Sequence, residues 1–347
     1  MATKMASRER VFAALDFRAP DIVPLEFHPS HCGLYDHGEK LKELFSSIPG
    51  DFGDISGVPI PSPAPSDFDA DGRYHVIRTD AWGITWEYRI FGLMGHPLRR
   101  PLDVISLARL AEYILPPPAH GDAAGVKAHA NRMKSAGYFC KMGGYSLLER
   151  MIGLRRFEDV LMDIAQDTDE INTLADMLVS YYEQDTPALI NAEIDCVAFG
   201  DDYGTQNALI MSPADFRRFV KPRLARMIKP FKDAGIKVHF HSCGYVYDIL
   251  PDLKEIGVDS IWPQLAVYNL PTLADTCRDL GLAAALHIDR AAVMTSGTPE
   301  LVRETMKRMD NAFKPRDGGS WFYVEIDNGF PYANIEALVD EIAKYRQ

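Results

Sequence analysis

The segment Lys237-Val238-His239-Phe240-His241-Ser242-Cys243-Gly244 carries the sharpest structural signal in the chain. Its side chains alternate as in a β-strand, and a glycine follows the last of them. An amphipathic helical pattern precedes it, beginning at Ser212-Pro213 and stopping at Gly235. Pro222 and Pro230 are expected to kink or divide that helix. The segment is therefore predicted to be a strand that follows a helix.

The same alternation of short apolar runs and helical patterns fills the chain beyond Ala130. It requires a parallel sheet with helical crossovers. No glycine-rich dinucleotide turn is visible, so residues 1–347 are predicted to form one α/β domain, a (β/α)8 TIM barrel. An eighth strand is expected between Leu147 and Ala192. The other seven candidate strands are Ile22–Phe27, Gly137–Met142, Cys196–Asp201, Lys237–Cys243, Ser260–Gln264, Ala283–Asp289 and Trp321–Asp327.

Residues 1–130 form a less regular N-terminal portion, and residues 131–347 hold the regular β/α units. A short helix capped by Ser7 is expected at the start. Tyr74–Ile90 has the alternating, aromatic character of a β-hairpin that turns near Asp80-Ala81-Trp82-Gly83. The predicted fold is therefore a barrel with an N-terminal extension and a hairpin.

Composition and charge exclude several classes of protein. The 37 basic residues are outnumbered by 49 acidic ones, which argues against a nucleic-acid surface. Five scattered cysteines lack the spacing of a disulfide framework. We find no signal-peptide pattern and no apolar run long enough to span a membrane. A cytoplasmic protein is expected.

Polar side chains gather at the predicted strand ends, where a barrel of this type carries its chemistry. The residues are Glu26, Asp201-Asp202, His241-Ser242-Cys243-Gly244, Gln264, His287, Asp289 and Glu325 to Asn328. His241 and Cys243 share one strand face, and an imidazole and a thiolate so placed can bind zinc with a third ligand from another strand end. The alternative is that both residues are buried packing residues. Asp201 and Glu26 are candidates for a substrate contact, a base or a structural cap, and Gln264 is suited to orienting a substrate.

Three groups of motifs run nearly from end to end of the chain: Ser7-Arg8-Glu9-Arg10-Val11 with Pro20-Asp21-Ile22-Val23-Pro24, His241-Ser242-Cys243-Gly244 with Ile249-Leu250-Pro251-Asp252-Leu253 and Ile256-Gly257-Val258-Asp259, and Ile288-Asp289 with Gly297-Thr298-Pro299-Glu300-Leu301-Val302. In these motifs the chain resembles the uroporphyrinogen decarboxylase superfamily, which includes zinc- and corrinoid-dependent methyltransferases. The resemblance implies a TIM barrel. Relatives pair their barrels mouth to mouth, so a homodimer is one assembly it suggests.

Two departures from the family pattern bear on the activity. True decarboxylases resemble one another in an arginine-rich segment that grips the substrate's carboxylates, but Phe27–Tyr35 contains no arginine. His241 and Cys243 instead resemble the zinc ligands of the methyltransferase branch. Where that branch has a third cysteine ligand, this chain has Asn328, so Asp327 or Glu325 would supply an oxygen ligand instead.

The resemblance implies three candidate functions. We favour a zinc-dependent methyltransferase component that moves a methyl group between a small substrate, a methyl ether or a thiol, and a corrinoid on a separate protein. His241 and Cys243 would then bind zinc, and Asp201, Gln264 and Glu26 would contact the substrate. The alternatives are a metal-free decarboxylase-like lyase that acts on a tetrapyrrole, and a non-catalytic tetrapyrrole- or corrinoid-binding barrel.

Overall fold

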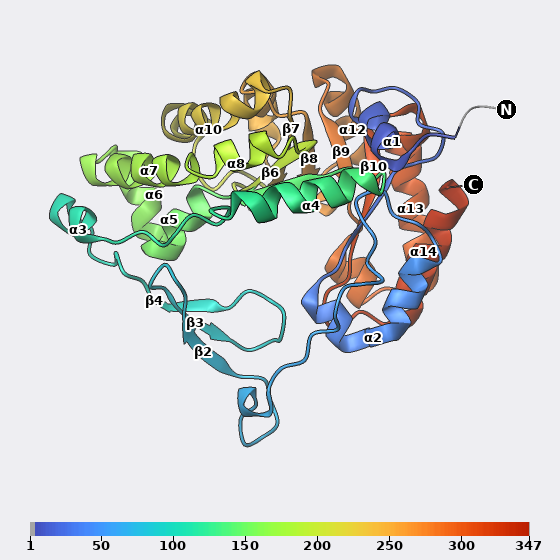
Figure 1. Cartoon of the computed structure of the whole chain (residues 1–347), viewed down its shortest axis with the longest axis horizontal. Coiled ribbons are helices and arrows are strands. Elements are labelled where there is room, and N and C mark those ends of the chain that lie inside the picture. The colour runs from blue at the N-terminus through green and yellow to red at the C-terminus, as the bar shows by residue number, and fades with distance from the viewer. Residues whose placement is uncertain (1–3, 347) are drawn as a thin grey trace.

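A curled parallel sheet of seven strands forms the centre of the computed structural model, which describes residues 4–346 (Figure 1). Its strand order is β1-β10-β9-β8-β7-β6-β5, with every neighbouring pair parallel. All seven strands expected from the sequence are present, although β5 begins four residues later than predicted and β1 begins three residues later. Their bounds are Leu25–His28 (β1), Lys141–Tyr145 (β5), Cys196–Gly200 (β6), Lys237–Ser242 (β7), Ser260–Pro263 (β8), Ala283–Leu286 (β9) and Ser320–Glu325 (β10). The predicted TIM-barrel-like α/β fold is confirmed.

The predicted location of an eighth strand was wrong. The stretch from Leu147 to Ala192 is helical, because its apolar residues recur at helical spacing and pack against the outside of the sheet. The main chain of Asp51 instead lies between the two edges of the sheet, bonded to β1 and to Phe139, two residues before β5. Its N–H donates to the Leu25 carbonyl at 2.7 Å, and its carbonyl accepts from the Phe139 N–H at 3.0 Å. This single bridging residue has no periodicity that a sequence pattern could reveal.

An ion pair inside the barrel joins the same two edge strands. Lys141 on β5 pairs with Glu26 on β1, and both side chains are largely buried. The Glu26 carboxylate also accepts a hydrogen bond from the Trp321 indole at 3.3 Å. These contacts hold the edges together across the gap between β1 and β5.

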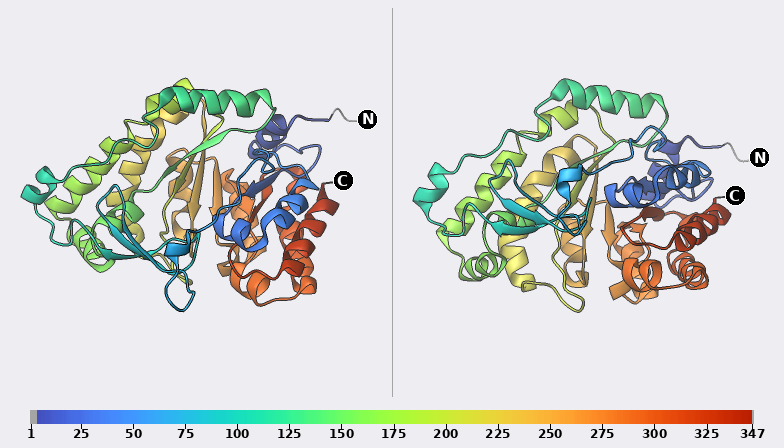
Figure 2. Two further views of the ribbon diagram at one scale, coloured as in Figure 1. Left: turned by 60° about the horizontal axis from the view of Figure 1, so that its bottom comes forward. Right: turned by 90° about the horizontal axis from the view of Figure 1, so that it is seen from below.

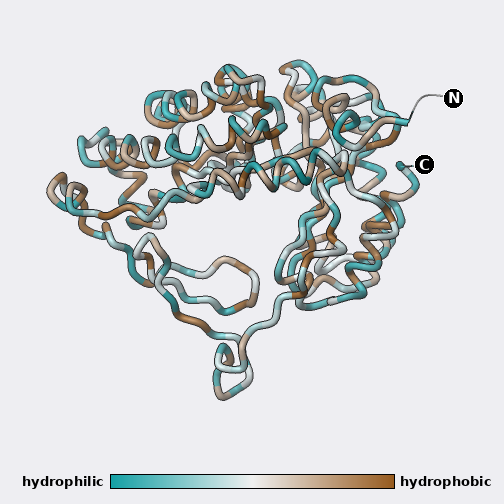
Figure 3. The backbone as a smooth tube through the Cα atoms, in the orientation of Figure 1, coloured by the Kyte–Doolittle hydropathy of each residue, from teal (hydrophilic) through white to brown (hydrophobic). Residues whose placement is uncertain are grey.

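Helices surround the sheet and bury its outer face (Figures 1 and 2). Figure 3 shows hydrophilic and hydrophobic residues interspersed along them, as expected for amphipathic helices with one face in the core. The helix bounds are Ser7–Leu15 (α1), His31–Ser46 (α2), Leu107–Glu112 (α3), Ala123–Ser135 (α4), Leu148–Leu154 (α5), Phe157–Gln166 (α6), Asp169–Tyr182 (α7), Thr186–Asn191 (α8), Pro213–Asp215 (α9), Lys221–Asp233 (α10), Leu250–Glu255 (α11), Leu270–Leu280 (α12), Pro299–Phe313 (α13) and Tyr332–Tyr345 (α14).

Two helix predictions can be compared with the structure. The N-cap of α1 is Ala6 and not Ser7, because the Glu9 carboxylate supplies the capping bond to the Ala6 N–H. The long pattern from Ser212 to Gly235 is divided near Pro222 as predicted, but α10 continues through Pro230 without a break. A π-helical turn at Phe216–Val220 separates α9 from α10, immediately before Pro222.

The predicted hairpin is part of a separate antiparallel sheet of three strands. Its strands are Val76–Thr79 (β2), Thr85–Tyr88 (β3) and His96–Arg99 (β4), the last of which was not expected. One end of this sheet packs on α5, where Ile84 contacts Gly153, and the other meets α2, where Phe91 packs on Tyr35. Helices α2 and α5 follow the carboxyl ends of β1 and β5, so the small sheet lies on the side of the barrel mouth (Figure 1). Within residues 4–346, the structure has no helix with the length and apolarity that a bilayer crossing requires.

Candidate metal centre and adjoining pocket

Three potential metal ligands converge where strands β6 and β7 end. His241 Nε2 lies 3.4 Å from Cys243 Sγ and 3.3 Å from Asp202 Oδ1. Potential ligand atoms of all three residues lie within 4.8 Å of one another, and the described residues 4–346 hold no other such group of three. The structure thus brings together the predicted histidine and cysteine with a carboxylate.

These ligands are held on two loops that contact each other at Gly204 and Gly244. A Cβ on Gly244 would lie 2.1 Å from the Gly204 carbonyl carbon, so the two main chains touch where any side chain would intrude. Gly244 also has a φ of +76°, which favours glycine. The Cys243 N–H donates to Asp202 Oδ1 at 2.7 Å, and the Tyr203 N–H donates to Ser242 Oγ at 3.0 Å. The close approach therefore sets Asp202 against the His-x-Cys segment.

The orientation of His241 suits metal binding. Its Nδ1 lies 2.9 Å from the Trp262 carbonyl oxygen, which can only accept, so Nδ1 carries a proton, and Nε2, which faces Cys243 and Asp202, is the atom that would bind a metal. A second hydrogen bond of this kind is the usual means by which a protein fixes a metal-binding imidazole. The Trp262 ring packs against the imidazole with 4.0 Å between ring centroids, which further restricts its rotation.

The separations of His241 Nε2 from Cys243 Sγ and Asp202 Oδ1 suit tetrahedral zinc. Typical Zn–N, Zn–O and Zn–S bonds place a nitrogen and a sulfur ligand about 3.6 Å apart, and a nitrogen and an oxygen ligand about 3.4 Å apart. The separations in the structure are 3.4 and 3.3 Å. Nitrogen, sulfur and oxygen are also the donor atoms that zinc accepts. The residues present therefore fit a zinc ion.

Electrostatics at the centre favour the addition of a cation. Burial, together with the nearby Asp202 carboxylate, raises the pKa of the Cys243 thiol to about 12. Burial alone would raise the pKa of Asp202 as well, but hydrogen bonds from His241 and from the Cys243 N–H hold it below its usual range. A cation bound between them would offset the desolvation of the thiolate and lower the thiol pKa.

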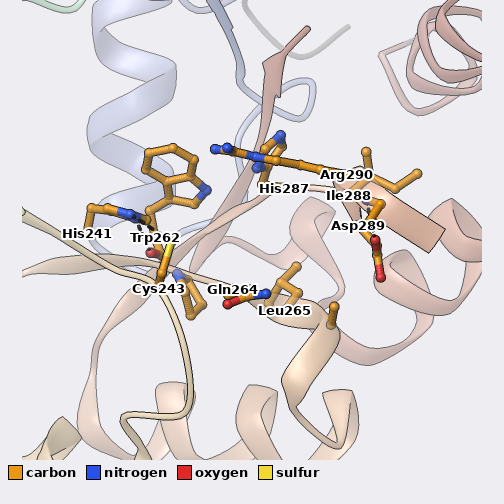
Figure 4. A pocket seen from close by; sticks show the side chains of 12 residues that line it. His241, Cys243, Trp262, Gln264, Leu265, His287, Ile288, Asp289 and Arg290 are labelled. Carbon is orange, nitrogen blue, oxygen red and sulfur yellow. Dashed lines mark hydrogen bonds between the residues drawn. The ribbon is translucent and has the colours of Figure 1, made fainter. Parts of the chain in front are cut away.

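A pocket of about 190 Å³ opens beside His241 and Cys243 (Figure 4). Its walls come from the ends of β7, β8 and β9 and from the loops that follow them. The lining residues are His241, Cys243, Trp262, Pro263, Gln264, Leu265, Ala266, His287, Ile288, Asp289, Arg290 and Ala291. The candidate metal centre therefore adjoins a small chamber with mostly apolar walls.

Asp201 has a structural position, although its neighbour reaches the metal centre. Its fully buried carboxylate accepts hydrogen bonds from the main-chain N–H groups of Leu147, Leu148 and Glu149 at 2.8 to 3.0 Å, and from the Tyr203 hydroxyl at 2.8 Å. It therefore caps the start of α5. Burial raises the pKa of Asp201 to about 6.

The remaining predicted residues occupy three different environments. Gln264 lines the pocket. Glu26 lies deeper in the barrel, paired with Lys141. Glu325 and Asp327 lie at the mouth, but Arg290 engages both carboxylates at 3.3 Å, and neither belongs to the cluster of potential ligands.

Sequence reasoning did not single out Trp262 or Arg290, although both line the pocket and lie beside predicted site residues. Trp262 precedes Gln264 by two residues, and Arg290 follows Asp289. His287, which was identified, is buried in the pocket wall, and burial lowers its pKa to about 3. Asp202 was seen only as the second member of an aspartate pair, and no sequence signal distinguishes it from Asp201.

Comparisons with known proteins agree with this architecture. The family model described as uroporphyrinogen decarboxylase (URO-D) matches residues 139–345. A methyltransferase from Methanosarcina mazei has a similar fold over 99% of this chain and 100% of its own, with 16% sequence identity and a TM-score of 0.61. A dihydropteroate synthase from Xanthomonas albilineans matches less well, with 13% identity, 58% of this chain, 65% of its own and a TM-score of 0.36. A search of the curated proteins finds no match.

Proposed function

We propose that this chain, which belongs to the uroporphyrinogen decarboxylase family, is a zinc-dependent methyltransferase component. It would move a methyl group between a small substrate and a corrinoid on a separate protein. One observation carries the proposal. His241 Nε2 lies at the separations expected of zinc ligands from Cys243 Sγ and Asp202 Oδ1, at the edge of a pocket. The fold shared with a methyltransferase is consistent with this activity.

Each residue of the centre has a distinct role in the proposal. When bound, zinc supplies Lewis acidity to a substrate heteroatom beside the pocket. His241 and Cys243 hold the ion from the end of β7, and Asp202 holds it from the loop after β6. Trp262 fixes the His241 tautomer through its carbonyl and forms part of the pocket wall. In this proposal Asp202 is the oxygen ligand, the role for which the family resemblance suggested Asp327 or Glu325.

The pocket supports a small substrate over a tetrapyrrole. Its volume of about 190 Å³ is below the roughly 300–1,000 Å³ typical of sites for drug-sized ligands. Arg290 is the one cationic side chain among the lining residues, and Glu325 and Asp327 already engage it. A substrate with many carboxylates would need several free cations.

The zinc content of purified protein tests the proposal. We expect about one zinc ion per chain in the wild type, and its loss in Cys243→Ser. Cys277→Ser is the matched control, because Cys277 is a buried cysteine on α12 away from the cluster. A wild-type protein without zinc would contradict the proposal, and tetrapyrrole binding would then be the function to test.

A further inference from the structure

The side-chain amide of Gln264 has a fixed orientation. Its Oε1 accepts the Gly244 N–H at 2.9 Å. A main-chain N–H can only donate, so the oxygen must face Gly244 and the Nε2 group must be the other end of the amide. No acceptor among residues 4–346 is hydrogen-bonded to Nε2. Because Gln264 lines the pocket, this amide nitrogen is a hydrogen-bond donor available to a bound molecule (Figure 4).

Most of the other polar groups of the pocket wall already have partners or are enclosed, but the Trp262 indole N–H has no hydrogen-bond partner among residues 4–346. Arg290 is engaged by two carboxylates, and Asp289 Oδ1 accepts the N–H groups of Ala291 and Ala292 at 2.8 Å. His287 Nε2 has no partner, but that atom is fully enclosed. Within the described part of the chain, the Gln264 amide and the Trp262 indole are therefore two lining side chains with an uncommitted donor, and the Gln264 amide is the one hydrogen-bonded to Gly244, the residue after Cys243.

The dimensions of the pocket match one six-membered ring. An apolar cavity of roughly 150 Å³ is enough to bind benzene. The pocket has about 190 Å³, which leaves room for a ring with a short substituent. Trp262, Pro263, Leu265 and Ile288 supply the flat and apolar surfaces that such a ring prefers.

We propose that Gln264 determines substrate specificity, and that its Nε2 selects the oxygen of a methyl ether attached to a single aromatic ring. This inference rests on the proposed function, whose substrate class it narrows from a methyl ether or a thiol to an aryl methyl ether. During transfer the methyl C–O bond breaks and its electron pair stays on the oxygen, while the Co(I) of a reduced corrinoid supplies the electron pair of the new Co–C bond. The Gln264 N–H would stabilise the negative charge that develops on the oxygen. A thiol sulfur is a weaker acceptor and would gain less from this donor.

The substitution Gln264→Glu tests the role of the Nε2 hydrogen-bond donor. A glutamate keeps an oxygen for the Gly244 N–H and replaces the pocket-facing donor by a negatively charged acceptor. Gln184→Glu is the matched control, because it makes the same change at an exposed helix-end position remote from the pocket. Binding can be measured on full-length protein freed of metal with a chelator, by ligand-observed NMR titration. The ligands are methoxybenzene and ethylbenzene, which differ mainly by an ether oxygen in place of a methylene.

We expect the wild type and Gln184→Glu to bind methoxybenzene about 3- to 10-fold more tightly than ethylbenzene, and Gln264→Glu to lose that preference. Equal binding of the two ligands by the wild type, a preference that survives in Gln264→Glu, or no binding of either ligand would each overturn the inference. Zinc content is measured on the same preparations before chelation. Zinc without an ether preference would refute the role of Gln264 alone, and an ether preference without zinc would refute the proposed function alone.

Discussion

Asp201 and Asp202 are adjacent in sequence, yet the structure predicts opposite effects of the same substitution. Asp202 Oδ1 faces His241 Nε2 at 3.3 Å, and its side chain is 42% exposed. Asp202→Asn keeps an oxygen for the Cys243 N–H but removes the charge that a zinc ion would bind. We expect zinc affinity to fall at least 100-fold, or about 2.7 kcal/mol, because even changes outside the ligand shell typically cost 10- to 100-fold. The free energy of unfolding without metal should change by less than about 1 kcal/mol.

Asp201→Asn should instead reduce stability and leave zinc binding nearly unchanged. The buried Asp201 carboxylate accepts three main-chain N–H groups and one hydroxyl, and an asparagine can accept only on one of its two terminal atoms. At least one buried N–H then loses its partner, together with the charge of the acceptor. We expect a loss of about 2–3 kcal/mol in the free energy of unfolding.

The two variants can be compared by two assays. Zinc affinity is measured by competition with a chromophoric chelator, and stability by urea unfolding of the metal-free protein. The reasoning is refuted if Asp202→Asn binds zinc as tightly as the wild type. It is also refuted if Asp201→Asn remains folded and stable but loses zinc.

Two other features of the barrel interior give predictions about stability. Burial holds the pKa of His287 at about 3, below its ordinary 6.5. As the pH falls, this histidine is therefore protonated in the unfolded chain before it is protonated in the folded protein. The folded state accordingly loses stability as the pH falls from 6.5 toward 3. In urea unfolding at pH 6.5 and 4.5, His287→Gln should remove roughly 2–3 kcal/mol of the wild-type loss over that interval; an unchanged pH dependence would contradict this. Lys141→Met leaves the Glu26 carboxylate buried without its cation and should cost about 3–5 kcal/mol, whereas Lys141→Met combined with Glu26→Leu should cost less. Equal losses in the single and double variants would show that the pair does not hold the two barrel edges together.

The sequence was sufficient to predict the features that depend on short-range patterns. Short apolar runs between helical patterns located the seven strands, and the His-x-Cys spacing placed His241 and Cys243 on one strand face. The bridge at Asp51 was missed because a single residue between the two edges of the sheet leaves no period in the sequence.

The third potential ligand, Asp202, could not be predicted from local sequence patterns for a different reason. Asp202 reaches His241 because Gly204 and Gly244 allow two loops to touch, and that contact joins residues 40 positions apart in the chain. The sequence also gave no indication that Arg290 would engage Glu325 and Asp327. Which of several acidic strand ends meets the His-x-Cys segment is decided by tertiary structure.

Zinc-dependent methyl transfer to free reduced cobalamin tests the central proposal most directly. The assay compares untreated, chelator-treated and zinc-restored protein across a panel of methoxylated aromatic compounds, and also follows the reverse reaction from methylcobalamin to thiols. The proposal predicts consumption of Co(I) that disappears with the chelator, returns with zinc and is absent in Cys243→Ser. Transfer rates in both directions equal to those without protein, in a preparation that holds zinc, would contradict it.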